Sequence, residues 1–243
     1  MNAPVNAPVI RRAPRRMSPQ ARREHLIAAA LELFGRHRPE RVSVDDVVAH
    51  AGVSRALFYR YFANIGELHL AALRSVTEGL IDRLAHREPG PPLHRLRAAL
   101  RGLIEVAESY RAGYVALLRS GSVIATSETD AVVDEVRDRA VAVILTDVGV
   151  TEPGPMLLVT LRCWTAVVEG ALLSWLEEGV PPRAELAGWL VDQLVAMVTA
   201  TAGHDPAVAD FVARVERLER SAQRAATESQ PSTSSGLRGP GPT

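Results

Sequence analysis

The spacing of apolar residues predicts an almost entirely helical chain. Apolar positions recur three and four residues apart through most of the sequence, which is the period of a helix with one buried face. No stretch alternates apolar and polar residues as a half-buried strand does. Ten helices are therefore expected, over residues 18–35, 43–51, 54–62, 64–87, 93–112, 114–120, 127–146, 156–178, 183–202 and 205–225, with Gly113 as the break between the fifth and the sixth.

The second and third predicted helices form the most informative segment of the chain. Ser43 is placed to cap the first of the two, and Asp46 three residues later completes a capping box. Gly52 permits a sharp turn, and Ser54 is placed to cap the helix that follows. This arrangement indicates a helix-turn-helix.

The third helix has two distinct faces when its residues are placed about 100° apart. One arc is apolar and aromatic: Leu57, Phe58, Tyr61 and Phe62. The opposite arc carries Arg55, Ala56, Tyr59 and Arg60. A helix that buries the first arc presents arginines, an aromatic hydroxyl and a small side chain to a partner, and these groups suit the major groove of DNA.

The sequence GVSRALFYRYF at residues 52–62, with NIGEL soon after it, resembles the TetR family of bacterial regulators. The preceding helix is similar to the family as well, in its ending with Ala30, Leu33, Phe34 and Gly35. The resemblance covers residues 18–70. One position departs from the family, because Ile65 stands where members often carry a lysine that contacts a phosphate.

The resemblance implies an all-α fold with an N-terminal three-helix helix-turn-helix domain and a C-terminal helical domain for ligand binding and dimerisation. The expected divisions are a disordered basic leader (1–17), a DNA-binding domain (18–63), an effector-binding and dimerisation domain (64–204), a C-terminal helix (205–225) and a disordered tail (226–243). The Arg-rich leader is either a solvated segment or an arm that lies along DNA.

The predicted DNA-binding residues are Ser43, Ser54, Arg55, Ala56, Tyr59, Arg60 and Tyr61. The resemblance assigns the four hydroxyl groups of this set to phosphates. Arg55 and Arg60 are the candidates for base edges, since guanine offers two acceptors to one guanidinium.

The charge distribution agrees with a DNA-binding N-terminus. The whole chain has a formal net charge of zero, yet residues 1–63 contain eleven arginines and only five acidic residues, so this end is +6 and the remainder is −6. A basic domain joined to an acidic body is the footprint expected of a nucleic-acid-binding domain with a second module.

The predicted helices at 156–178 and 183–202 are apolar over more than one face and contain all three tryptophans. A surface helix needs one apolar stripe, so the second face predicts a homodimer interface. The alternative is packing within the core. The predicted interface residues are Trp164, Leu172, Trp175, Trp189 and Leu194.

Polar residues on apolar helices are candidates for an effector site, because buried polar groups need partners. The predicted residues are Tyr110, Tyr114, Arg119, Cys163 and Glu169. At each position, packing in the core or an ordinary ion pair in solvent remains the alternative.

Other classes of protein find no support in the sequence. The single cysteine excludes an internal disulfide, and no two histidines stand four residues apart as metal ligands on a helix do. The sequence has no Gly-rich phosphate loop, HExxH or GxSxG motif. We therefore predict no metal, no cofactor and no enzymatic activity. The absence of a secretory signal and of a long uncharged apolar run predicts a soluble cytoplasmic protein.

Together these patterns predict a ligand-responsive transcriptional repressor that binds palindromic operator DNA as a homodimer and responds to an unknown small-molecule effector. Two alternatives remain open. One is a helical small-molecule-binding or enzymatic domain with a vestigial helix-turn-helix. The other is a DNA-binding regulator that has no effector.

Overall fold

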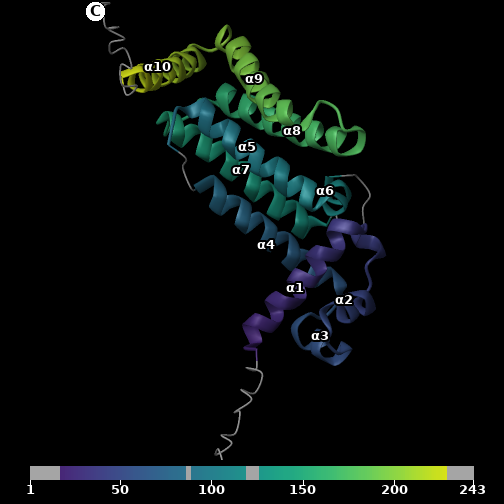
Figure 1. The fold of residues 1–243 in the computed structure, drawn as a ribbon. Helices are drawn as coiled ribbons and strands as arrows, with labels where there is room; N and C mark the ends of the chain where they lie inside the picture. The colour runs from purple at the N-terminus through teal and green to yellow at the C-terminus, as the bar shows by residue number, and fades with distance from the viewer. Residues whose placement is uncertain (1–16, 86–88, 119–125, 229–243) are drawn as a thin grey trace, which may run out of the picture.

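The computed structural model describes residues 17–85, 89–118 and 126–228, and these ranges are helical with no strand. The all-α prediction is thus confirmed. Figure 1 shows a small group of N-terminal helices at one end of a larger layered bundle. The predicted leader, apart from Met17, and most of the predicted tail lie outside the described residues.

The N-terminal group contains three α-helices and one short 3₁₀ turn. In chain order these are α1 (Pro19–Arg36), η1 (Pro39–Arg41), α2 (Val44–Ala51) and α3 (Arg55–Tyr61). Ser18 caps α1 by accepting a hydrogen bond from the Ala21 amide at 3.1 Å, and Pro19 occupies the first turn, where its missing N–H has no cost. Gly52 ends α2 with φ at +65°, the left-handed conformation that favours glycine.

A compact apolar core holds these helices together. Leu26 of α1, Val47 of α2 and Phe58 of α3 are all fully buried, and Phe62 and Leu68 join the same cluster. Because Leu68 belongs to α4, the first turns of that helix complete this core before α4 continues along the larger bundle.

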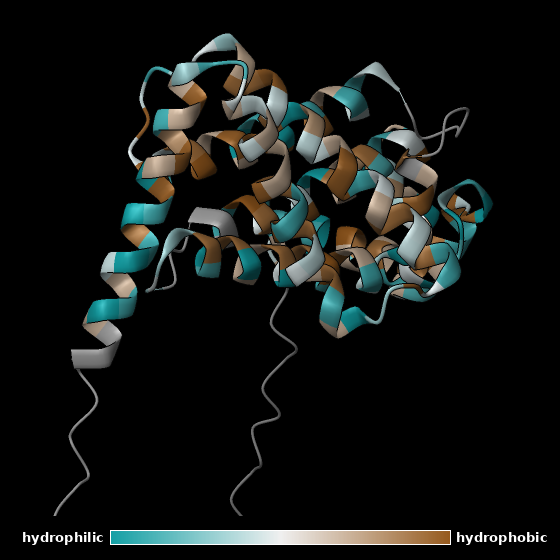
Figure 2. Ribbon diagram, turned by 90° about the horizontal axis from the view of Figure 1, so that it is seen from above, coloured by the Kyte–Doolittle hydropathy of each residue, from teal (hydrophilic) through white to brown (hydrophobic). Residues whose placement is uncertain are grey.

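Seven helices form the rest of the described chain: α4 (Ile65–Ala85), α5 (Pro92–Ser109), α6 (Arg111–Leu118), α7 (Ser127–Val148), α8 (Pro155–Glu178), α9 (Arg183–Ala202) and α10 (Pro206–Glu228). Helix α7 packs against α4 and α8, α9 packs against α5 and α8, and α10 packs against α9 (Figure 1). Both hydrophobic and hydrophilic residues occur along each helix in Figure 2, as expected of helices with one buried face.

The second core lies between α5, α7, α8, α9 and α10. Leu161, Leu172 and Leu190 are completely buried there. The Trp164 indole N–H donates a 2.9 Å hydrogen bond to the Leu190 carbonyl, which satisfies the one polar group of a 3% exposed side chain. Helix α8 has the length and apolar composition of a membrane span, and in this structure its apolar residues supply much of the core.

Four of the five predicted interface residues are corrected by this packing. Trp164, Leu172, Trp175 and Leu194 are between 0 and 8% exposed within a single chain. They face the surrounding helices because α8 and α9 are covered by α5, α7 and α10, a long-range arrangement that the local pattern does not contain. Trp189 is 43% exposed and stays a candidate for an interface.

The predicted break at Gly113 is also wrong. Helix α5 ends at Ser109, and Gly113 lies inside α6. A Cβ on Gly113 would stand 3.8 Å from the Phe34 Cβ, and a Cβ on Gly35 would stand only 2.9 Å from the Ser109 carbonyl oxygen. These glycines therefore allow α1 to pack closely against the corner between α5 and α6.

Helix α10 is fixed to the bundle by two side chains. Arg214 donates hydrogen bonds to the carbonyls of Val148 and Gly149 at the end of α7. Glu219 accepts a 2.8 Å hydrogen bond from the Leu93 amide. The N-cap of α5 is Pro91, which offers no side-chain acceptor, so Glu219 satisfies an amide that the helix itself leaves unpaired.

We expect Glu219→Ala to lower the free energy of unfolding by about 1 kcal/mol, because the lost carboxylate is the cap of α5. Urea denaturation followed by circular dichroism measures the change. Glu216→Ala is the matched control on the same helix. Among the described residues Glu216 pairs with Arg220 at 3.2 Å, and both side chains are more than half exposed, so its loss should cost less than about 0.5 kcal/mol. Equal effects of the two substitutions would contradict the capping role.

Candidate DNA-binding site and ligand cavity

Helix α3 has one buried face, which packs against the N-terminal core, and one exposed polar face. Phe58 is 0% exposed, while Tyr59 on the next position is 50% exposed. The two rings meet edge to face with centroids 5.3 Å apart, an arrangement that favours one orientation of the tyrosine. Ala56 and Arg60 are exposed on the same side as Tyr59. The structure thus brings these predicted residues onto one accessible surface.

The serines of the predicted set cap helices. The Ser43 hydroxyl donates to Asp46 Oδ2 at 2.6 Å and accepts from the Asp46 amide at 3.2 Å, forming the predicted capping box. The side-chain and backbone hydrogen bonds from Ser43 hold the pKa of Asp46 below its ordinary value. Ser54 accepts from the Leu57 amide at 3.2 Å. Both caps fix the start of a helix and leave exposed residues at its N-terminus, where anions bind favourably.

Arg55 is held by the neighbouring helix. Its Nη1 lies 2.9 Å from both carboxylate oxygens of Asp45 on α2. Hydrogen bonding to the Tyr59 side chain, and then the charge of Asp45, raise the pKa of Arg55. Arg60 has no ion pair among the described residues. The structure therefore separates two arginines that the sequence treats alike, and Asp45 is a residue of this surface that the sequence analysis missed.

Tyr61 lies apart from the exposed set. It is partly buried and packs against the N-terminal core, as its position on the apolar arc implies. Beside it, the Arg23 guanidinium of α1 lies 5.1 Å from the centre of the Phe62 ring, a cation–π contact that ties α1 to the end of α3.

A cavity of about 1040 Å³ opens within the C-terminal bundle. Its walls come from all seven helices α4–α10 and are mainly aliphatic, with Tyr114, Trp164 and Phe211 as aromatic members. This volume is at the upper end of the range of about 300–1,000 Å³ that is typical of small-molecule sites. Charged residues also stand in the walls, and two pairs of them are joined across helices.

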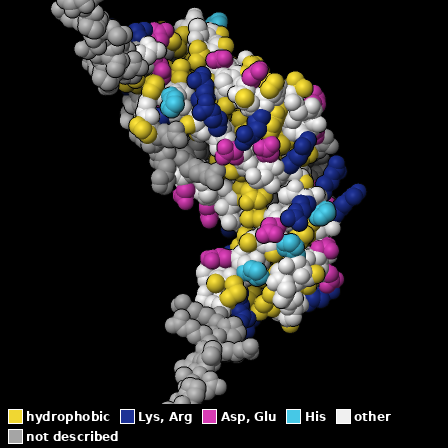
Figure 3. All heavy atoms as spheres, in the orientation of Figure 1, with side chains coloured by type: hydrophobic (Ala, Val, Ile, Leu, Met, Phe, Trp, Pro, Cys, Tyr) yellow, Lys and Arg dark blue, Asp and Glu magenta, His cyan; other side chains and the backbone are white. Residues whose placement is uncertain are grey.

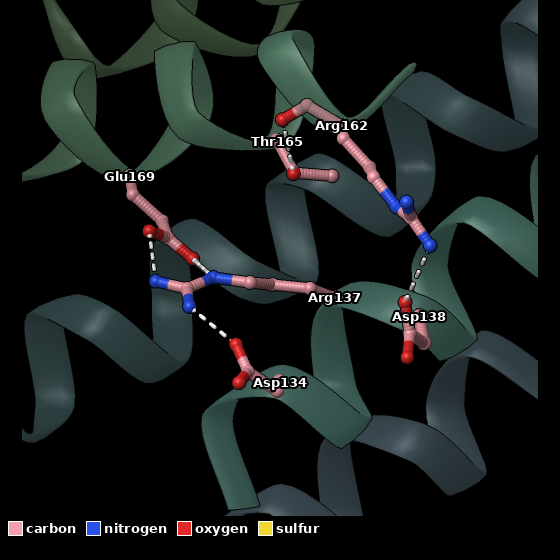
Figure 4. A network of polar contacts seen from close by, with 6 residues as sticks. All are labelled: Asp134, Arg137, Asp138, Arg162, Thr165 and Glu169. Carbon is pink, nitrogen blue, oxygen red and sulfur yellow. Dashed lines mark hydrogen bonds and ion pairs between the residues drawn. The ribbon is translucent and has the colours of Figure 1, made fainter. Parts of the chain in front are cut away.

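The first pair is Arg137 of α7 with Glu169 of α8 (Figure 4). Arg137 Nε and Nη2 each donate a 2.7 Å hydrogen bond to one oxygen of Glu169, and Nη1 donates at 2.7 Å to Asp134. The hydrogen bonds to Glu169 are the main cause that raises the pKa of Arg137. Beyond this pair in Figure 4, Arg162 and Asp138 stand 3.9 Å apart and are both exposed.

The second pair is Arg95 of α5 with Asp147 of α7. Arg95 Nε lies 3.2 Å from Asp147 Oδ2, and the two side chains are 20 and 11% exposed. On the face shown in Figure 3, by contrast, acidic and basic side chains are scattered over the surface with hydrophobic side chains between them.

The predicted effector residues divide into two groups. Tyr114 and Glu169 line the cavity. Cys163 is exposed, on the face of α8 opposite the buried Leu161 and Trp164, and Tyr110 is the C-cap of α5 and does not line the cavity. Those two predictions are corrected, because helical position turns Cys163 outward and the end of α5 places Tyr110 at the corner. Arg119 lies outside the described residues.

The sequence analysis missed Arg137, which bridges two helices beside the cavity. A signal was present, since Arg137 stands at helical spacing from Val133 and Ala140, which share its face of the helix and also line the cavity. No group of three or more His, Cys, Asp or Glu side chains that could hold a metal ion occurs in the part of the chain that the structure describes.

Comparison with known proteins matches both parts of the chain to one family. Residues 26–72 match the family described as bacterial regulatory proteins, tetR family, and residues 92–197 match the tetracyclin repressor-like C-terminal domain. Among curated relatives, the HTH-type transcriptional activator FasR of Mycolicibacterium smegmatis is 32% identical over 101 residues, which are 41% of this chain and 46% of FasR. The regulator BetI of Agrobacterium fabrum is 39% identical over 59 residues, which are 24% of this chain and 29% of BetI. The chain thus spans less than half the length of these curated relatives.

A solved structure matches over much more of the chain. The tetR-family transcriptional regulator from Streptomyces coelicolor is 32% identical, with a TM-score of 0.79, and the match covers 88% of this chain and all of that one. The regulator FadR from Bacillus subtilis, solved in complex with stearoyl-CoA, shares the fold at 15% identity, with a TM-score of 0.58 over 72% of this chain and 98% of that one. The chain belongs to the TetR family of bacterial transcriptional regulators.

Proposed function

We propose that this chain is a ligand-responsive repressor that binds palindromic operator DNA as a homodimer in the cytoplasm. Residues 18–63 would be the DNA-binding domain, residues 64–204 the effector-binding and dimerisation domain, and residues 205–225 a C-terminal helix. The observation that carries the proposal is the polar face of α3, which is exposed and yet held by two capped helices and a buried aromatic ring.

The exposed face of α3 fits the major groove. Arg60 is exposed near the end of the helix without an ion pair in the described structure, so its guanidinium is available to a guanine edge. Tyr59 stands one position before it and offers a hydroxyl to a phosphate or base. Ser43 and Ser54 stay exposed at two helix N-termini, where a phosphate is favoured. Ala56 permits close approach of the backbone to DNA.

The cavity supports control by a small molecule. It is large and mainly apolar, as ligand sites are. Among proteins of the same fold, FadR from Bacillus subtilis binds stearoyl-CoA in its crystal structure, and SmeT is the repressor of a multidrug efflux pump of Stenotrophomonas maltophilia. An effector acts by binding more tightly to one of two conformations. In the proposed mechanism, the occupied conformation holds the two α3 helices at a spacing that no longer fits successive major grooves.

A second copy of the chain would pack against the outer face of α8 and α9. Val159 of α8 is 54% exposed, and Trp189 of α9 is 43% exposed. On the same outer side of α8 lie small residues, including Gly170, where a Cβ would meet no atom within 4 Å. Small side chains and exposed apolar groups allow two helix pairs to approach closely, and a dimer supplies the second DNA-binding domain that a palindrome needs.

Two competing functions are less consistent with the structure. In an enzyme or ligand carrier with a vestigial helix-turn-helix, the two helix caps and the exposed Tyr59 and Arg60 would have no purpose. In a regulator without an effector, a cavity of about 1040 Å³ would lower stability without benefit. Two measurements distinguish our proposal from these alternatives: whether the protein binds operator DNA, and whether added ligand changes that binding.

We expect Arg60→Ala to weaken operator binding by about 1–3 kcal/mol, because a bidentate contact to a base would be lost. The operator is first identified by sequencing DNA fragments that the purified protein retains, and affinities are then measured by fluorescence anisotropy. Tyr59→Phe should weaken binding by a smaller amount. Arg139→Ala, which removes an exposed arginine of α7, is the control and should leave affinity unchanged. Wild-type affinity in both α3 variants would refute the groove assignment.

We expect Asp45→Asn to raise the affinity for unrelated duplex DNA, because it removes a negative charge and releases Arg55 to the phosphates. The slope of log K against log salt should steepen by about one unit. Glu24→Gln is the control, since it removes a negative charge from an exposed position of α1 that holds no arginine. If both variants change the slope equally, the release of Arg55 has no part in the effect.

We expect Gly170→Glu to convert the dimer into a helical monomer with weak operator binding, because it places a charge on the proposed interface. Gly79→Glu is a matched control on α4, since a Cβ there also meets no atom within 4 Å. Both substitutions favour the helix locally by removing a glycine, so neither should unfold the chain. Sedimentation measures the association state. A monomeric wild-type protein, or a Gly170→Glu variant that remains a dimer, would refute the proposed interface.

A further inference from the structure

We propose that the effector is an uncharged, largely apolar molecule with a hydrogen-bond acceptor, that Tyr114 donates to this acceptor, and that the cavity discriminates against carboxylates. This inference rests on the proposed function, because it names the class of ligand that the cavity takes. Three observations support it. The cavity walls are mainly apolar, the Tyr114 hydroxyl has no hydrogen-bond partner among the described residues, and the charged groups of Arg137 and Glu169 are already paired with each other.

The apolar walls determine that most of the ligand is hydrocarbon. Aliphatic side chains from α4 through α10 line the cavity, and Trp164 is also part of its wall. Water in such a space finds few polar partners. A ligand with a substantial hydrocarbon portion therefore gains from leaving water and entering the cavity.

Tyr114 supplies a donor that no group in the described part of the chain uses. It lies on α6, lines the cavity, and is mostly buried. Its hydroxyl has no hydrogen-bond partner among the described residues. Burial is the main cause that raises the pKa of Tyr114, and the charge of Glu169 adds to it. The side chain therefore stays a neutral phenol at physiological pH and can donate to a carbonyl or ether oxygen of a ligand.

The nearby ion pair opposes an anionic ligand. Arg137 directs Nε and Nη2 to Glu169 and Nη1 to Asp134, so the edges of its guanidinium that meet carboxylates are already occupied. Glu169 lines the cavity and its side chain is 23% exposed, whereas Asp134 is 65% exposed to solvent. A ligand carboxylate beside Tyr114 would therefore lie next to the Glu169 carboxylate with no free edge of Arg137 to bind it, and like charges repel.

The remaining arginines that line the cavity do not offer a free guanidinium to a ligand carboxylate inside it. Arg95 is paired with Asp147 at 3.2 Å, and Arg220 is paired with Glu216 at 3.2 Å. Arg101 lines the cavity from an exposed position on α5, where solvent screens its charge. At Tyr114 itself, a quaternary ammonium group has no acceptor for the phenol, and both oxygens of Glu169 already accept hydrogen bonds from Arg137.

Three probes that share a ten-carbon chain test the inference: methyl decanoate, decanoate and decyltrimethylammonium. Binding to the full chain is measured by isothermal titration calorimetry at pH 7.5, with one site per chain as the criterion for specific binding. We expect methyl decanoate to bind at least about tenfold more tightly than either charged probe. Decanoate binding equal to or tighter than that of the ester would overturn the proposal, and so would the absence of binding by all three probes.

Two variants identify the groups responsible. Tyr114→Phe keeps the ring and removes the hydroxyl, so methyl decanoate should bind about 2- to 12-fold more weakly, the loss expected for one hydrogen bond, while decyltrimethylammonium binding should not change. Glu169→Gln removes a negative charge of similar shape and should increase decanoate binding. Unchanged ester binding by Tyr114→Phe would overturn the role of the phenol. Operator affinity, measured on the same samples without probe, tests the proposed function separately.

Discussion

The packing of α1 against the helices around it fixes the position of the DNA-binding domain. One side of α1 buries Leu26 and Ala30 in the core that α2, α3 and the start of α4 share. Its C-terminal end meets α6, and here Gly35 approaches the Ser109 carbonyl so closely that a Cβ would lie 2.9 Å from the oxygen. Close packing of this kind does not yield gradually, because well-packed interfaces change between discrete arrangements. The orientation of α3 therefore depends on the contact between α1 and α6.

The same contact connects the cavity to the DNA-binding domain. Gly113 and Tyr114 are neighbours on α6, yet Gly113 faces Phe34 of α1 while Tyr114 lines the cavity. Phe34 in turn meets His69 of α4 edge to face at 4.8 Å, and burial lowers the pKa of His69, so this imidazole is neutral and packs as an aromatic ring. A ligand at Tyr114 is thus one helical position from the α1 interface. Contact alone does not establish coupling, which also requires that the ligand prefer one of two arrangements of α6.

Local chemistry explains what the sequence predicts well. The caps at Ser43 and Ser54 and the glycine turn at Gly52 involve residues only a few positions apart, so the local sequence is enough to predict them. The two faces of α3 follow from helical period in the same way. What the sequence does not contain is which helix covers which. Trp175 and Trp189 both look like members of an apolar helix, but only the three-dimensional packing buries the first and exposes the second. The ion pair of Arg55 is likewise not predictable from the local sequence, because the angle between α2 and α3 determines that Asp45 lies beside Arg55.

The ion pairs in the cavity walls keep the surrounding helices apart. A mainly apolar cavity inside a helical bundle tends to collapse, since its lining loses contacts that neighbouring side chains could restore. Arg137 and Glu169 join α7 to α8 through two 2.7 Å hydrogen bonds, and Arg95 with Asp147 joins α5 to α7. Such pairs add little net stability, because burying the charges offsets their attraction. They do set the distance between the helices they join, since breaking either pair would leave a charge without its partner. The charged groups that form these pairs therefore hold the surrounding helices apart and keep the apolar space between them open.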